Sequence, residues 1–419
     1  MKKTLFIALI LLPFLCAAQQ NPDFAARLAE NPGRYGQNNH TYEFAHLSDA
    51  KAPKGYKPFY ISHYGRHGAR SDWGETQYAR LRDNLQAAKD KGILSTSGDS
   101  LLWEAAEIAR LHDGMNGRLT RKGCEEQSRL AERMYKRYRR VFRRGSRRVR
   151  CEASTVQRCI VSMAAFTNSL VRQDRKLGIS MDTGERFYEY ISNGMSDSLQ
   201  AICKPWLDSL AATAVADADA VYGRLFTDTA AAFELIPNAQ QLCSDIFDTG
   251  REAEAFETGR SLFRFLPAEY LYKKWENMNA TAYIWNCNSA ELGRDRLPDC
   301  DNLVEDIIRK ADEAIAGDGP AADLRFGHDW PGLALAAYLG LEGVGDRMSF
   351  NEAVHNWPGF EYMPFSMNLQ MVFYRSRKGG VLVKFLYNEK ETLLRGLSPV
   401  SGPYYDWDTV KENIKGYLR

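Results

Sequence analysis

The sequence lacks any apolar stretch long enough to cross a lipid bilayer. The apolar run from Leu5 to Leu15 is shorter than the roughly 20 residues that a membrane-spanning helix needs, and no later stretch is apolar enough. Internal repeats, low-complexity linkers and the composition typical of disordered or collagen-like chains are also missing. We therefore expect no stable membrane span.

At 419 residues, the chain can form one large globular domain or two ordinary ones.

The cysteines lack the spacing of a metal site. No pair of cysteines has zinc-finger spacing, so a structural metal is not expected. Seven cysteines follow residue 18, and an odd number leaves at least one thiol free even where export permits disulfides. Cys287 and Cys300 flank a polar, turn-rich stretch and are the pair that we expect to form a bridge.

The first residues have the pattern of a secretory signal. Basic residues precede the apolar run, and Cys16-Ala17-Ala18 supplies small residues where a signal peptidase cuts. We predict cleavage after Ala18 and a periplasmic or secreted protein. Cys16 could also belong to a lipoprotein signal, but Phe14 and Leu15 occupy positions where that signal requires small residues.

Residues 61–72 place a histidine between two arginines. The stretch reads Ile-Ser-His-Tyr-Gly-Arg-His-Gly-Ala-Arg-Ser-Asp, so His67 lies between Arg66 and Arg70. Guanidinium groups bind phosphoryl oxygens through paired N–H donors, and an imidazole can attack phosphorus and still leave near neutral pH. Residues 57–64 alternate like a strand, which puts these side chains at a strand's carboxyl end, where open α/β sheets bind ligands. The pattern indicates phosphate chemistry.

Two later segments also join a strand to a helix. Residues 149–152 read as a strand, after which Ser154 or Thr155 can cap a helix that carries Arg158 in its first turn. The helix dipole and the free N–H groups there favour an anion. Residues 324–341 read as a strand, then Gly327-His328-Asp329, then an apolar helix that begins near Pro331.

Four segments together resemble the histidine phosphatase superfamily, in the branch of histidine acid phosphatases and phytases. Residues 61–72 resemble its Arg-His-Gly-x-Arg signature, residues 117–127 its Gly-x-Leu-Thr-x-x-Gly-x-x-Gln segment, residues 152–166 the region of a further phosphate-binding arginine, and residues 324–341 its distal His-Asp motif. The first motif usually closes with proline, whereas Asp72 stands here, which affects the path and charge of that loop. A sister group of inositol polyphosphate phosphatases carries His-Ala-Glu at the distal position, and this sequence does not.

The resemblance implies a metal-independent phosphomonoesterase that needs no cofactor. His67 would attack phosphorus, and Asp329 would protonate the departing oxygen and then help to deprotonate water. The implied phosphate-binding residues are Arg66, Arg70, Arg158 and His328. Phytate or another inositol phosphate is the leading substrate, since several cationic side chains suit a polyphosphorylated ligand.

Some of these residues also have a structural interpretation. Asp329 precedes a helix, where Asp is a favoured cap, and Arg158 could be a surface arginine. His63 and His67 have an H-x-x-x-H spacing, which would suit a metal on a helix, but the strand pattern and the glycines argue against one. We therefore expect His63 to point away from the phosphate or into packing.

Two other functions remain open. The chain could be a phosphoryl-transferring mutase, because the superfamily contains such enzymes, or a protein that binds phosphorylated ligands without turnover. The export signal and the His-Asp pair favour hydrolysis. The sequence does not give the oligomeric state.

The expected fold is α/β, with a central mixed, mainly parallel sheet flanked by helices. Between residues 167 and 300 strand patterns vanish and helical spacing recurs, which predicts an inserted, mostly helical cap. The core would then consist of residues 19–166 and 301–419. Residues 367–374 and 381–387 predict a late hairpin.

Residues 133–150 contain ten Arg or Lys and no acid, interleaved with aromatic residues. Such a run is typical of nucleic-acid or anionic-membrane binding. An exported protein rarely meets nucleic acid, so we expect no nucleic-acid partner. A solvated helix face with some ion pairs, or a surface that steers polyanionic substrates, explains the run instead.

Overall fold

The computed structural model describes residues 21–415 except 75, 188–190 and 192–194. The predicted signal at residues 1–18 lies outside this part of the chain. Within the described ranges, no helix combines the length and the apolar character that a membrane span requires.

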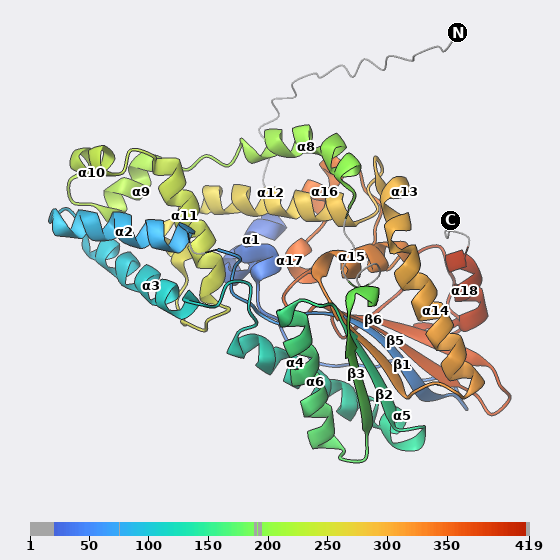
Figure 1. Ribbon diagram of the computed structural model, residues 1–419. Helices are drawn as coiled ribbons and strands as arrows, with labels where there is room; N and C mark the ends of the chain where they lie inside the picture. Colours follow the sequence, from blue (N-terminus) through green and yellow to red (C-terminus); the bar gives the residue numbers. More distant parts are fainter. Residues whose placement is uncertain (1–20, 75, 188–190, 192–194, 416–419) are drawn as a thin grey trace, which may run out of the picture.

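One mixed sheet forms the centre of the α/β part (Figure 1). Its strand order is β3-β2-β4-β1-β5-β6-β7, and β8 pairs with β6. The pairings among β1 to β4 are parallel, whereas β5 to β8 pair antiparallel. The strands are β1 Lys57–Arg66, β2 Arg148–Ala153, β3 Gly178–Thr183, β4 Ala322–Gly327, β5 Asn368–Arg375, β6 Val381–Tyr387, β7 Lys390–Thr392 and β8 Tyr404–Asp406.

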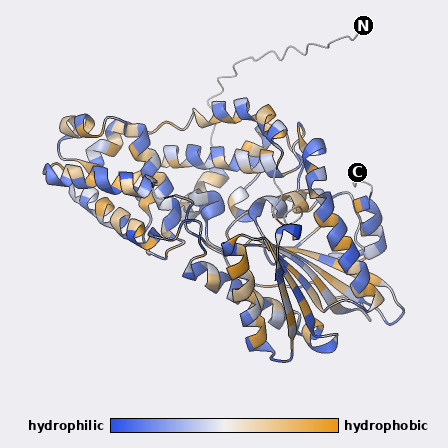
Figure 2. Cartoon of the chain, in the orientation of Figure 1, coloured by the Kyte–Doolittle hydropathy of each residue, from blue (hydrophilic) through white to orange (hydrophobic). Residues whose placement is uncertain are grey.

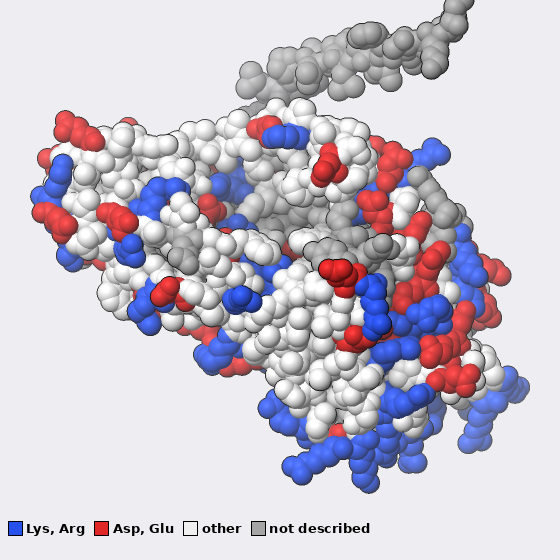
Figure 3. Space-filling view, viewed as in Figure 1, with Lys and Arg blue, Asp and Glu red and all other residues white. Residues whose placement is uncertain are grey.

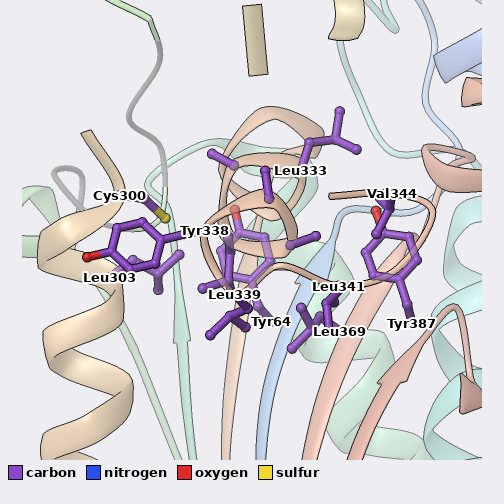
Figure 4. Close-up of a cluster of buried hydrophobic side chains, with 14 of the residues drawn as sticks. Tyr64, Cys300, Leu303, Leu333, Tyr338, Leu339, Leu341, Val344, Leu369 and Tyr387 are labelled. Carbon is purple, nitrogen blue, oxygen red and sulfur yellow. The ribbon is translucent and has the colours of Figure 1, made fainter. Parts of the chain in front are cut away.

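Helices cover both faces of this sheet because its strands are apolar on both sides. Ile61 of β1 packs with α4, α5 and α6, while Tyr60 and Tyr64, which point the other way, pack with α14, α15 and α18. Figure 4 shows Tyr64 and Leu369 of the sheet beside Leu339 and Leu341, in the same apolar cluster. The helices are α4 Arg121–Arg137, α5 Arg139–Arg144, α6 Gln157–Gln173, α14 Asp301–Ala316, α15 Asp329–Tyr338 and α18 Trp407–Lys415.

A second apolar cluster joins helices from distant parts of the sequence. These helices lie beyond one end of the sheet and turn their apolar faces toward one another (Figures 1 and 2). They are α1 Pro22–Glu30, α2 Thr76–Asp90, α3 Thr96–His112, α9 Ala218–Leu225, α10 Thr229–Leu235, α11 Ala239–Ala253 and α12 Ala268–Asn286. The remaining helices are α8 Asp197–Ala211, α13 Gly293–Arg296, α16 Phe350–Asn356 and α17 Gly359–Tyr362, with short 3-10 turns at Pro32–Asn39, Glu185–Phe187, Leu262–Phe265 and Leu297–Cys300.

The predicted α/β class, with a sheet and a helical part, is confirmed. However, the strands and the helices of the two parts are distributed along the sequence differently from the expectation. The stretch 167–300 contains a strand, β3, at the edge of the sheet. Its side chains are mostly exposed, so it lacks the apolar pattern that marks the buried strands. Conversely, α2 and α3 precede residue 167 and yet pack into the helical cluster. The division into folding units at 166 and 301 stays a prediction.

The expected Cys287–Cys300 bridge is wrong. Both cysteines are buried free thiols, as are four of the other cysteines in the described chain, while Cys124 is only partly buried. Burial raises the pKa of the Cys287 and Cys300 thiols well above the usual range, so both stay protonated at physiological pH.

Candidate active site

The carboxyl ends of three parallel strands bring the predicted site residues together. The register pairs Arg66 at the end of β1 with Gly327 at the end of β4, and Ala153 at the end of β2 with Phe326. The residues that follow these strands therefore share one edge of the sheet. His67 follows β1, Ser154 follows β2 and His328 follows β4.

His67 is buried, and its two ring nitrogens differ. Its Nδ1 lies 2.8 Å from the carbonyl oxygen of Gly68. Because a carbonyl only accepts, Nδ1 carries the proton and the lone pair resides on Nε2. Burial and the nearby Arg66 and Arg158 guanidinium groups hold the pKa of His67 well below its usual value. The ring is therefore a neutral imidazole with a free nucleophilic nitrogen.

Three guanidinium groups surround this imidazole. Arg66 is 1% exposed, Arg158 2% and Arg70 7%. Burial lowers the pKa of Arg66 to about 10, which leaves it charged at neutral pH. Among the described residues, the Nε atoms of Arg66 and Arg70 have no hydrogen-bond acceptor. Buried donors without acceptors are costly, so these two are suited to an oxyanion that enters the site.

Arg158 lies in the first turn of α6, as predicted, but the expected cap does not form. The N-cap residue is Val156, which has no side-chain cap hydrogen bond. Ser154 instead places its Oγ 3.3 Å from Nε2 of His328, while Arg158 donates through Nη2 to Nδ1 of His328 at 3.3 Å. The strand-to-helix junction thus positions the distal histidine.

His328 is neutral. Burial, followed by the charge of Arg158, lowers the pKa of His328 to about 3. Its ring stacks on Trp330, with centroids 4.8 Å apart, and meets the ring of His67 edge-on at 5.6 Å. The buried, cationic surroundings therefore disfavour a further positive charge on His328.

Asp329 begins α15 and contacts the cationic cluster directly. Its Oδ2 lies 3.2 Å from Nη2 of Arg66 and accepts a 3.0 Å hydrogen bond from Nδ2 of Asn38. Burial alone would raise the pKa of this carboxyl, but Arg66 and Asn38 outweigh burial and hold the pKa below its usual value. The cap residue of α15 is His328, so Asp329 is the first helical residue rather than the cap.

Two glycines permit a close approach between the histidine loop and α4. A Cβ on Gly68 would lie 2.3 Å from the carbonyl oxygen of Gly123, and one on Gly123 would lie 2.3 Å from that of Ala69. Thr120, the N-cap of α4, donates through Oγ1 to the Ala69 carbonyl at 3.0 Å. Two motifs that are far apart in the sequence therefore form one backbone cradle around His67.

Buried polar side chains of α4 hold this cradle in place through hydrogen bonds. Gln127 donates through Nε2 to the carbonyl oxygen of Arg66 at 2.9 Å. Glu126 accepts from the backbone N–H of Ala69 at 3.0 Å and from Oγ of Ser366 at 2.8 Å. Hydrogen bonds to the backbone on both sides of His67 hold this residue in one place.

His63 has the structural role that was predicted for it. It is 3% exposed and its ring packs 5.6 Å from the rings of Phe166 and Phe326. No group of three or more His, Cys, Asp or Glu residues in the described chain is arranged to hold a metal ion.

Three residues at the site have no signal in the sequence. Asn38, in the 3-10 helix Pro32–Asn39, contacts Asp329 and also accepts from Arg66 through its backbone carbonyl at 2.6 Å. Arg251 of α11 donates to Oδ1 of Asn38 at 3.0 Å. Trp73 is 60% exposed, and the guanidinium carbons of Arg158 and Arg70 lie 4.3 and 5.5 Å from its ring centroid. An exposed aromatic ring therefore packs against two buried arginines of the site.

The loop at Asp72 places a carboxyl group beside one of the site arginines. Oδ1 of Asp72 lies 3.3 Å from Nη1 of Arg70 and accepts the backbone N–H of Trp73 at 2.8 Å. The carboxylate therefore offsets part of the charge of Arg70 and shapes the turn that presents Trp73.

Comparison with known proteins bears on the fold. No protein-family model matches the chain, and no curated protein matches it in sequence. Among solved structures, the apo form of the Bifidobacterium longum multiple inositol polyphosphate phosphatase is similar, with a TM-score of 0.73 and 18% identity over 91% of this chain and 97% of that one. The same protein in complex with inositol hexasulfate gives a TM-score of 0.70 at 18% identity, with the same coverage of both chains.

A phytase from D. castellii is also similar, with a TM-score of 0.64 and 11% identity over 92% of this chain and 85% of that one. These similarities span nearly the whole of both chains, although their low identity speaks for the fold alone. The resemblance drawn from four short motifs is confirmed at that level: this chain has the fold of inositol polyphosphate phosphatases and phytases.

Proposed function

We propose that this protein is a secreted, metal-independent phosphomonoesterase that acts through a phosphohistidine at His67. The observation that carries the proposal is the state of His67 itself. Its Nδ1 proton is held by the Gly68 carbonyl, its Nε2 lone pair is free, and three buried guanidinium groups surround it. Only the predicted signal supports secretion, since the fold leaves the place of action open.

In the first step, Nε2 of His67 attacks phosphorus and the bond to the ester oxygen breaks. Arg66, Arg70 and Arg158 stabilise the charge that spreads over the equatorial oxygens. Asp329 donates a proton to the departing oxygen. In the second step, water attacks the phosphohistidine, Asp329 takes a proton from that water, and His67 leaves as a neutral imidazole.

The pKa of Asp329 suggests how the proton donor becomes protonated. Arg66 and Asn38 favour the carboxylate form of Asp329. A bound phosphate dianion would contact Arg66, which weakens the stabilisation of the Asp329 carboxylate by that guanidinium group. The phosphate would also place negative charge near Asp329, and both effects raise the pKa of Asp329. We therefore expect activity to be highest under acidic conditions, where substrate binding and protonation of Asp329 occur together.

Inositol phosphates such as phytate are the proposed substrates. The fold is shared with phosphatases of inositol polyphosphates and with phytases, and one of these was solved with inositol hexasulfate. The presence of Asp329 directly after His328 is the His-Asp pattern of the acid phosphatase and phytase branch rather than His-Ala-Glu. Other phosphate monoesters remain alternatives within the same proposal.

The test is phosphate release by the purified mature chain from a panel of phosphorylated compounds that includes phytate. We expect release that persists in EDTA and is lost in His67→Ala, while His46→Ala, which changes an exposed histidine, retains activity. Transfer of phosphate to a second sugar phosphate would identify a mutase, and binding without release would identify a binding protein. Near wild-type turnover in His67→Ala would contradict the proposal.

A further inference from the structure

The basic run at residues 133–150 separates into two groups in the structure. One group is engaged with the rest of the chain. Arg133 pairs with Glu389, Arg137 with Asp49, Arg150 with Asp323 and Lys136 with Glu132, while Arg148 donates to the carbonyl oxygen of Asp318. The second group consists of Arg139, Arg140, Arg143, Arg144 and Arg147, which together line one hollow of about 480 Å³. We call these five residues the arginine surface.

The arginine surface is poorly neutralised. Within the described chain, no acidic side chain lies within ion-pair distance of Arg139, Arg140, Arg143 or Arg144, and each of these four is exposed. Arg147 approaches one acid, Asp174, at 3.9 Å. Figure 3 shows the lysine and arginine side chains gathered at this end of the α/β part.

The helix that carries most of these arginines is firmly attached to the core. α5 spans only Arg139–Arg144, and its two apolar residues, Val141 and Phe142, are buried. Phe142 also stacks on Tyr135 of α4, with ring centroids 5.5 Å apart. Burial of this one face obliges the arginines of α5 to project outward, so their positive charges repel one another and remain available to an anionic partner.

The position of the arginine surface separates it from the candidate active site. α5 precedes the amino end of β2, whereas Arg158 and His67 lie beyond the carboxyl ends of β2 and β1. Six residues of strand span about 20 Å. A substrate bound at His67 therefore does not contact these arginines.

We propose that the arginine surface docks the protein on an anionic lipid membrane. The hollow is an open surface feature lined by arginine side chains alone, whereas pockets for small molecules are mostly apolar and enclose their ligand. Clustered arginines on an exposed, anchored helix suit an extended array of phosphate headgroups, to which each cation contributes independently. In this orientation, the edge of the sheet that carries His67 faces away from the membrane and toward the solvent. This inference does not depend on the proposed phosphatase activity.

The experiment is co-sedimentation of the full mature chain with vesicles of phosphatidylcholine that contain about one third phosphatidylglycerol. We expect binding at low salt, little binding to pure phosphatidylcholine, and release as added salt screens the charges. Each arginine should contribute about five-fold, so Arg140→Gln/Arg143→Gln/Arg144→Gln should bind about 100-fold more weakly.

A matched variant removes the same charge elsewhere. Arg82, Lys89 and Lys204 lie on helices outside the sheet and are 45, 54 and 69% exposed. Replacement of these three by Gln should leave vesicle binding within about two-fold of wild type, because each cation acts only within a Debye length of the membrane.

Four results would overturn the proposal. The first is no binding to the phosphatidylglycerol vesicles at low salt, and the second is equal weakening in the matched variant. The third is displacement from vesicles by inorganic phosphate at the same phosphate concentration, which would assign the hollow to free phosphate. The fourth is binding to double-stranded DNA that the triple variant abolishes, with no binding to vesicles.

Discussion

Replacement of Asp329 by Asn should slow the release of a poor leaving group far more than the release of a good one. An alkoxide is a strong base and needs a proton in the transition state, whereas nitrophenolate can depart unaided. General acid assistance is worth roughly 10²–10⁴-fold, so phosphorylation of His67 by an alkyl phosphate should slow by that factor. Phosphorylation by p-nitrophenyl phosphate should change by less than about ten-fold.

The contacts of Asp329 show why the variant should still fold. In the native protein, Oδ2 of Asp329 lies 3.0 Å from Nδ2 of Asn38 and 3.2 Å from Nη2 of Arg66. An Asn side chain can place its oxygen at the same position. Its NH2 group then faces the backbone N–H of Trp330, which donates to Oδ1 at 3.2 Å in the native protein. A buried donor left without an acceptor costs about 1–3 kcal/mol, which is still less than a typical stability of roughly 5–15 kcal/mol.

The same substitution should tighten the binding of inorganic phosphate. The Asp329 carboxylate competes with phosphate for Arg66, and Asn removes that competing charge. A variant that binds product more tightly while releasing alkoxides more slowly separates proton donation from a general loss of structure.

The assay is single-turnover phosphorylation of the enzyme by both substrates, with circular dichroism as the test of folding. Asp72→Asn is the matched control, because its carboxylate also lies beside a site arginine, 3.3 Å from Nη1 of Arg70, but is not the proposed donor. Equal slowing with both substrates, or an unfolded Asp329→Asn protein, would refute the role of Asp329 as proton donor.

Three further predictions concern residues around the site. Asn38→Ala removes a hydrogen bond that favours the Asp329 carboxylate, so the pKa of Asp329 should rise. The alkaline limb of the kcat–pH profile should then move to higher pH by about one unit, and an unmoved limb would contradict this role of Asn38. Gly68→Ala would put a Cβ 2.3 Å from a carbonyl oxygen of α4 and should cost at least about 2 kcal/mol in urea unfolding, whereas full stability would show that the cradle relaxes. Burial lowers the pKa of His63 to about 3 in the folded protein, against about 6.5 in the unfolded chain, so only the unfolded state gains a proton on this residue as the pH falls below 6.5. This protonation lowers the free energy of unfolding by about 2 kcal/mol between about pH 6.5 and 5, and His63→Leu should abolish that decrease. If the variant loses as much stability as wild type over this range, His63 is not the cause.

The sequence predicted the site residues that follow strands, because alternation marks a strand and glycines mark its end. His67 and His328 lie at strand ends that the register brings to one edge, and Arg158 lies in the predicted helical turn. The edge strand β3 was missed because most of its side chains are exposed, which removes the apolar pattern.

Contacts between distant segments could not be predicted in this way. Asn38 reaches Asp329 across 291 positions of sequence, through a 3-10 helix that shows no local functional pattern. The sequence pattern offers Ser154 or Thr155 as a helix cap. In the structure the hydroxyl of Ser154 lies beside His328 instead, and only the pairing of β2 with β4 reveals that partner. Local patterns assign an element and its end, whereas the partner of a polar side chain depends on the tertiary fold.

The most direct test of the account is a search for phosphate on His67. Wild-type enzyme quenched during turnover of p-nitrophenyl phosphate should carry acid-labile, base-stable phosphate on the peptide that contains His67, and His67→Ala should carry none. Phosphate on another residue, or rapid turnover with no phosphorylated enzyme in either protein, would contradict the phosphohistidine mechanism.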